Sequence, residues 1–157
     1  MTTTEESVAS MRPKALNGLR LNSFAAVVMI LLEFSLGVGV NVFSTLPQAD
    51  HGRAVFTAFG SAVTGGPLVL TVHALLGTVL LVTGVSALAR ASLIRQPALI
   101  LITVIAFLGI VAAWLSGARF VGTMANGASM TMAIATAVST LCYAFILFIV
   151  PKPTTQE

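Results

Sequence analysis

Four long apolar stretches, separated by short polar segments, dominate the pattern of the chain. They cover residues 21–46, 67–89, 97–118 and 127–150. Each stretch meets the roughly 20 residues that an α-helix needs to cross about 30 Å of hydrocarbon. Backbone polar groups in lipid must be paired within their own segment, which favours helix over any open strand. The pattern predicts an all-α, integral membrane four-helix bundle with up-down topology.

The segment between the first two stretches has a helical pattern of its own. Asp50 can cap a helix that runs from His51 to Val63. On such a helix one face is apolar, which predicts a short amphipathic helix lying at the membrane interface. It could form a lid over the bundle or be a plain connector. The residues of the apolar face are Val55, Phe56, Phe59 and Val63.

Composition excludes a soluble domain. Hydrophobic residues make up 57% of the 157 residues, charged residues 8%, and the mean hydropathy is +0.99. Soluble domains carry about 25% charged residues, so this chain could not cover a water-exposed surface. Its length suits a single membrane domain.

The positions of Lys and Arg predict the orientation. With the N-terminus inside, six basic residues fall on one side and two, Arg53 and Arg119, on the other. This asymmetry predicts a cell-membrane protein with a cytoplasmic N-terminal tail, 1–20, and a cytoplasmic C-terminal tail, 151–157. Residues 1–13 are polar and are expected to be disordered. A cleaved signal peptide is the alternative for the first stretch, but its apolar core would span only about 7–15 residues.

The expected partners follow from the same composition. The basic residues are dispersed, so the net charge of +3 does not indicate nucleic acid. The lipid bilayer is the expected partner of the long apolar stretches. Small residues recur at helical spacing, which is typical of close helix packing and would suit a membrane protein partner or a second copy of the chain. Cys142 is the only cysteine, and no metal site is expected. No catalytic motif is found, so no catalytic residue is predicted.

Glu33 is the most unusual residue of the first stretch. It lies near the middle of an otherwise uncharged segment, where a carboxyl group costs a few kcal/mol and marks a functional candidate. Gly37 and Asn41 follow at helical spacing on the same face. This polar and small stripe is expected to face the bundle interior. The alternative is a structural role, with protonated Glu33 hydrogen-bonded to a neighbouring helix.

His73 is the second unusual residue, near the outer end of the second stretch. Gly77 and Gly84 share its helix face, which leaves a groove beside the imidazole. By depth, His73 lies between Glu33 and Asn41, so a Glu33–His73 hydrogen bond is possible if the two stripes face each other. A histidine bonded to a neighbouring hydroxyl or amide is the alternative.

Three further residues complete the candidates. Trp114, near the outer end of the third stretch, is interpreted as a membrane anchor. Arg119 and Asn126 are expected at the outer mouth, where Arg119 could attract an anionic group or simply end its helix. The connections 90–96 and 119–126 are expected to be short loops.

The segment His73-Ala-Leu-Leu-Gly77 resembles the second helix of cytochrome b561-like and haem-A-synthase-like bundles, and the layout is similar to that of small bacterial four-helix membrane proteins. The resemblance covers the helix count and one histidine. It implies haem b as a cofactor with His73 as an axial ligand. The fourth stretch has no histidine, so the second ligand would be His51 or His73 of a second copy.

The sequence leaves three functions open. The leading prediction is a non-enzymatic membrane subunit or interaction module, because small-residue faces are typical of helix association. A haem- or quinone-binding electron-transfer module using His73 is the first alternative. A proton or small-solute pathway through Glu33, His73 and Asn41 is the second.

Overall fold

The computed structural model describes residues 2–43, 54–123 and 125–150, with side chains from residue 13 onward except those of 41–43. The described residues form helices and no strand, as the sequence predicts. Four of the helices are long and apolar enough to cross a membrane, and a shorter apolar helix follows the first of them. The helices are α1 (Thr2–Phe43), α2 (Val55–Gly65), α3 (Leu68–Ile94), α4 (Pro97–Thr123) and α5 (Asn126–Ile149).

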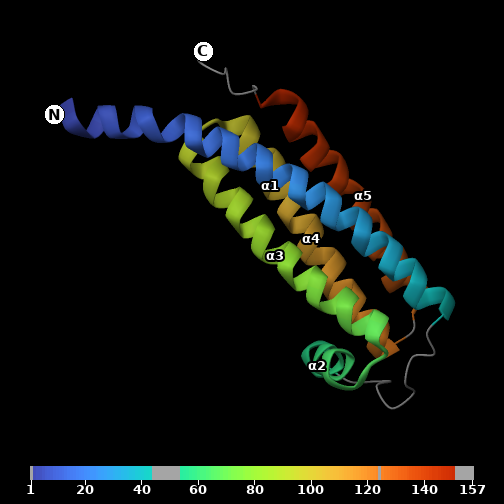
Figure 1. Ribbon diagram of the computed structural model, residues 1–157. Helices are drawn as coiled ribbons and strands as arrows, with labels where there is room; N and C mark the ends of the chain where they lie inside the picture. The colour runs from blue at the N-terminus through green and yellow to red at the C-terminus, as the bar shows by residue number, and fades with distance from the viewer. Residues whose placement is uncertain (1, 44–53, 124, 151–157) are drawn as a thin grey trace.

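The four long helices pack as a ring in which α1 contacts α3 and α5, and α4 contacts the same two helices from the other side. The short α2 lies across one end of the bundle and contacts α3 and α4 (Figure 1). The part of α1 at the opposite end lies beside the end of α5 (Figure 1). We call these the α2 end and the terminal end of the bundle.

Helix α1 is longer than predicted. It begins at Thr2 rather than near residue 21, so the expectation of disorder over residues 1–13 is wrong from Thr2 onward. Pro13 lies inside the helix without ending it, since a single proline removes one backbone hydrogen bond and bends a helix more readily than it stops it. The first part of α1 projects beyond the bundle (Figure 1).

The connection between α3 and α4 is shorter than the predicted 90–96 loop. It consists of Arg95 and Gln96, and Arg95 adopts the left-handed conformation that commonly ends a helix (φ 58°). Arg90 therefore belongs to α3, and its guanidinium lies on Gly18 of α1. A long arginine stem can lie along apolar surface, so a charged residue here does not stop the helix.

Helix α2 differs from the expected helix at its start and in its buried face. It begins at Val55, after an extended Ala54 that provides no side-chain cap; Asp50 and His51 lie outside the described residues. Its buried residues are Ala58 and Ala62 rather than the predicted aromatic and valine face. Alanines let the backbone approach the neighbouring helices closely, which a face of larger side chains would prevent.

The buried side chains form two clusters. The larger, which we call the terminal core, joins α1, α3, α4 and α5 and contains Leu19, Tyr143 and Ile146. The smaller, the α2-end core, consists of Val40, Ala58, Ala62, Leu70 and Val121. Large apolar side chains also point outward along the long helices, Phe148 with 92% of its surface exposed among them. In a bilayer, lipid covers this surface.

Helices α4 and α5 approach each other closely at Gly109. The Ser139 hydroxyl donates a hydrogen bond to the carbonyl of Ala106 (2.9 Å) across this contact. A Cβ at position 109 would lie on Ser139 Oγ and 2.9 Å from the carbonyl oxygen of Ala135. The backbone oxygen cannot move aside without separating the helices, so glycine is required here.

We predict that Gly109→Ala destabilises the protein by about 1–3 kcal/mol, because the added methyl group overpacks the α4–α5 contact. Gly127→Ala is the matched control, since a Cβ there meets nothing within 4 Å. The measurement is the unfolding free energy of both variants in detergent micelles. Equal stability of the two variants would contradict the packing described.

Candidate functional site

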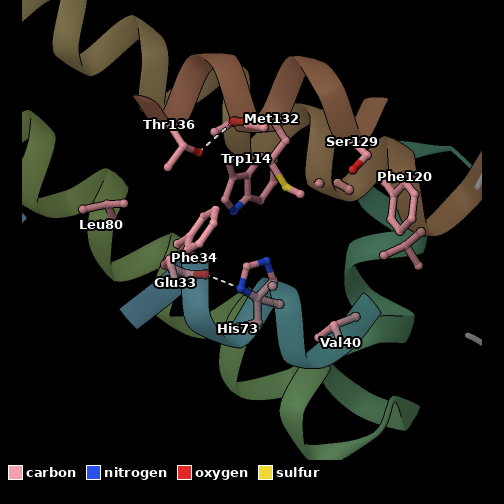
Figure 2. Close-up of a pocket in the computed structure, with 18 of the residues that line it drawn as sticks. Glu33, Phe34, Val40, His73, Leu80, Trp114, Phe120, Ser129, Met132 and Thr136 are labelled. Atoms are coloured by element: carbon pink, nitrogen blue, oxygen red, sulfur yellow. Dashed lines mark hydrogen bonds and ion pairs between the residues drawn. The ribbon is translucent and has the colours of Figure 1, made fainter. Parts of the chain in front are cut away.

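A cavity of about 220 Å³ lies inside the bundle between the terminal core and the α2-end core. All five described helices contribute to its lining, which is mainly apolar and includes several glycines and alanines (Figure 2). Among the described lining residues, Glu33 and His73 are the only ionisable ones. The two residues that the sequence marked as unusual therefore face the same space.

Glu33 of α1 and His73 of α3 are in direct contact, with the imidazole Nδ1 against the carboxyl Oε2 (Figure 2). Glu33 is buried, with 8% of its surface exposed, and His73 is partly buried. The Glu33–His73 contact, which the sequence allowed if the polar and small faces of the two helices faced each other, is therefore present. It joins two helices whose spans contain few other polar groups, so it also fixes how α1 and α3 are turned toward each other.

Two glycines make room for this pair. A Cβ at Gly37 would lie 3.5 Å from Cε1 of His73, and a Cβ at Gly77 would lie 3.4 Å from Oε1 of Glu33. Each glycine thus lies directly against the partner from the other helix. The small residues that follow Glu33 and His73 at helical spacing therefore provide the space for the pair.

The pair is only partly satisfied by the protein. Oε1 of Glu33 is buried and has no hydrogen-bond partner among the described residues. Leaving such a group unpaired costs about 1–3 kcal/mol. The second ring nitrogen of His73, Nε2, points away from Glu33 into the cavity (Figure 2). The site therefore offers hydrogen-bonding capacity that the bundle itself does not use.

Trp114 of α4 forms the wall opposite this pair. Its indole N–H donates to the hydroxyl of Thr78 (3.4 Å), and its ring lies 4.9 Å from the ring of Phe59 on α2, measured between centroids. Phe56 lies farther from the indole, at 6.3 Å. The indole lines the cavity and links α4 to α2. Its interpretation as a membrane anchor stays a prediction.

Sequence reasoning missed Trp114 and Phe59 as site residues. A usable signal was present, because Trp114 immediately follows Ala113 on the small-residue face of the third stretch. A large aromatic beside small residues fits a widened space between helices as well as a membrane surface. Nothing in the sequence indicated that Phe59 would reach it, since the path of the first loop decides that contact.

The cavity opens sideways between α1 and α5. Its strongly exposed lining residues are Phe34 and Val38 on α1 and Ala133 on α5. The described lining residues of α2, α3 and α4 are buried or half-buried. In a membrane this opening faces hydrocarbon rather than water, because it lies along apolar helix surfaces.

Of the other predicted site residues, those whose side chains the structure describes do not join the pair. Asn41 belongs to α1, but its side chain lies outside the described residues, as does His51. Arg119 lies on α4, and Asn126 is the first residue of α5. Both are exposed and neither lines the cavity.

Comparison with protein-family models, with curated proteins and with solved structures finds no match to this chain. The resemblance to cytochrome b561-like and haem-A-synthase-like bundles therefore stays a prediction that rests on His73 and the helix count.

The described residues around the cavity do not fit haem b. His73 Nε2 is available as a ligand, but the described part of the chain brings no second histidine near it. A space of about 220 Å³ also holds a single ring with substituents rather than a porphyrin macrocycle. The described residues likewise contain no group of three or more metal-ligating side chains.

We predict that Glu33 and His73 are energetically coupled. Glu33→Leu or His73→Leu alone leaves the partner buried and unpaired, whereas the double variant removes both polar groups. A double-mutant cycle on unfolding free energies in micelles should therefore give a coupling of about 1–3 kcal/mol. Ser35→Leu combined with His73→Leu is the control, because Ser35 is exposed and bonds within its own helix. Additive effects in both cycles would contradict the contact.

We also predict that Phe59→Ala shifts the fluorescence of Trp114, the only tryptophan, to longer wavelength, because the indole loses the ring that covers it at the α2 end. Phe148→Ala is the control, since Phe148 is exposed on the outside of the bundle. Unchanged emission in Phe59→Ala would show that α2 does not cover Trp114.

Proposed function

We propose that this multi-pass membrane protein binds a small apolar molecule in the cavity beside Glu33 and His73. The observation that carries the proposal is a space of about 220 Å³ with an apolar lining and one buried polar pair. An apolar cavity of roughly 150 Å³ in another protein is large enough to bind benzene. The expected ligand is therefore a molecule, or a headgroup, of about one substituted ring.

The position of the opening supports uptake from the membrane. Ligand sites are typically apolar, with a few polar groups that fix orientation, and they are often found between the helices of bundles. The exposed lining residues on α1 and α5 face lipid, so an apolar ligand would enter without crossing water. A tail attached to the ring could remain in the bilayer. A quinone headgroup meets this description, and haem does not.

We further propose that both chain ends face the cytoplasm of a cell in whose membrane the protein resides. The distribution of Lys and Arg supports this orientation, since the terminal end of the bundle carries most of them, including Arg20, Arg90 and Arg95. The cavity would then lie in the outer half of the membrane, with α2 at the outer surface.

The other functions predicted from the sequence receive less support. A pathway across the whole bundle would have to cross the terminal core, where Leu80, Ile110 and Tyr143 are buried. A role as a membrane subunit or interaction module would be compatible with the outward apolar side chains, but lipid covers such surfaces equally well. The interaction role does not account for a partly satisfied polar pair that faces a cavity.

We predict that bromobenzene, a single-ring molecule with a heavy-atom quencher, quenches Trp114 saturably in detergent micelles. Trp114 is the only tryptophan and lines the cavity, so the emission reports occupancy directly. Ala113→Leu should abolish the saturable component, because the larger side chain fills the cavity from α4. Ala137→Leu, at an exposed position on α5 outside the lining, is the matched control.

Two results would overturn the proposal. One is quenching that rises linearly with bromobenzene and never saturates, because partition into the micelle alone would explain it. The other is saturable quenching that is equal in Ala113→Leu and Ala137→Leu, because the binding site would then lie elsewhere.

A further inference from the structure

The protonation of the Glu33–His73 pair restricts what the cavity can bind. Nδ1 and Oε2 are in direct contact. If both atoms were unprotonated, their lone pairs would repel each other, so the arrangement that is stable on chemical grounds has one proton between them. No other ionisable side chain is found among the described lining residues. A net charge on the pair would therefore be buried without a counter-ion, which is costly in an apolar medium. The pair is stable when it is neutral overall.

A neutral pair has two arrangements in which the shared proton lies in the contact. In one, a carboxylate faces an imidazolium; in the other, a carboxylic acid donates to neutral imidazole. Both arrangements leave a proton on Nε2, because Nδ1 is engaged with the carboxyl group. Moving the carboxyl proton to Oε1 would leave a buried hydroxyl group without an acceptor, since Oε1 has no partner among the described residues. The pair thus presents an N–H donor to the cavity.

We infer that the ligand carries a hydrogen-bond acceptor oxygen, such as the carbonyl of a ring ketone or quinone, and that it accepts a hydrogen bond from Nε2–H of His73. Glu33 is a positioning residue that keeps the proton on Nε2. This inference rests on the proposed function. It adds the chemical class of the ligand and the atom that recognises it.

The surroundings of Nε2 agree with this assignment. Figure 2 shows Nε2 directed into the open part of the cavity, away from the carboxyl group. At Gly37 a Cβ would lie 3.9 Å from Nε2, so the glycine leaves the space beside this nitrogen free. An acceptor can therefore approach a donor that already points into the cavity and that makes no hydrogen bond to the described residues. Such a donor discriminates between ligands more strongly than the apolar walls do.

The test compares acetophenone with α-methylstyrene, which has the same shape but replaces the carbonyl oxygen by a methylene group. Both compounds compete with bromobenzene for quenching of Trp114 in wild type and in His73→Phe. For each protein, the affinity for acetophenone is divided by the affinity for α-methylstyrene. The ratio in wild type is then divided by the ratio in His73→Phe, so that the different partition of the two compounds into micelles cancels. We expect this quotient to be about five to ten, the value of one hydrogen bond.

A second readout needs no change at His73. The chain has two histidines, so ¹⁵N-histidine labelling together with His51→Gln assigns the resonances of His73. Saturating acetophenone should shift the Nε2–H resonance, and α-methylstyrene should leave it unchanged. Glu33→Leu should reduce the shift, because the proton is then free to move to Nδ1, whereas Ser35→Leu should preserve it.

The outcomes separate this inference from the proposed function. A quotient near one, or an Nε2 resonance that ignores acetophenone at saturation, would overturn the inference while saturable bromobenzene binding kept the cavity as a ligand site. Absence of saturable binding by every probe would overturn both. If His73→Phe fails to fold, the resonance in wild type decides alone.

Discussion

Close approach of helices at small residues is the constraint on which this bundle depends. In lipid, apolar side chains gain little by leaving the hydrocarbon for another helix, so helices associate through tight packing and a few polar contacts. Gly109 brings α4 against α5, Gly18 accepts the side chain of Arg90, and two glycines flank the Glu33–His73 contact. Polar contacts between the helices are few, such as the hydrogen bond from Asn22 to Ser86 between α1 and α3 (2.8 Å).

The polar pair gains its chemical meaning from this surrounding. In water, a glutamate beside a histidine would exchange protons with the solvent, and the attraction between the two side chains would be weak. Inside the bundle, separating the two groups would leave each of them buried without a partner, so they stay in contact. The hydrogen-bonding capacity that they do not use on each other faces the cavity. The apolar walls set the size of what can bind, and the imidazole sets its orientation. Size and orientation are thus controlled by different parts of the site.

The sequence predicted the spanning helices well because the bilayer imposes length and hydrophobicity on each of them. It also marked Glu33 and His73, since ionisable groups are rare in such stretches. It failed where local signals are weak. The polar composition of residues 2–13 suggested disorder, although the segment continues α1. The role of Trp114 depended on helix rotation, which periodicity in nearly all-apolar helices cannot reveal, and the contact with Phe59 depended on the path of a loop.

The cavity also divides the bundle into two regions of unequal cohesion. The terminal core joins four helices through many buried side chains, whereas the described part of the α2-end core consists of five residues. Local opening in proteins is least costly where few apolar contacts must break. Local opening of the α2 end is therefore expected while the terminal core stays closed. This would give a ring too large for the resting opening a way to enter without unfolding the molecule.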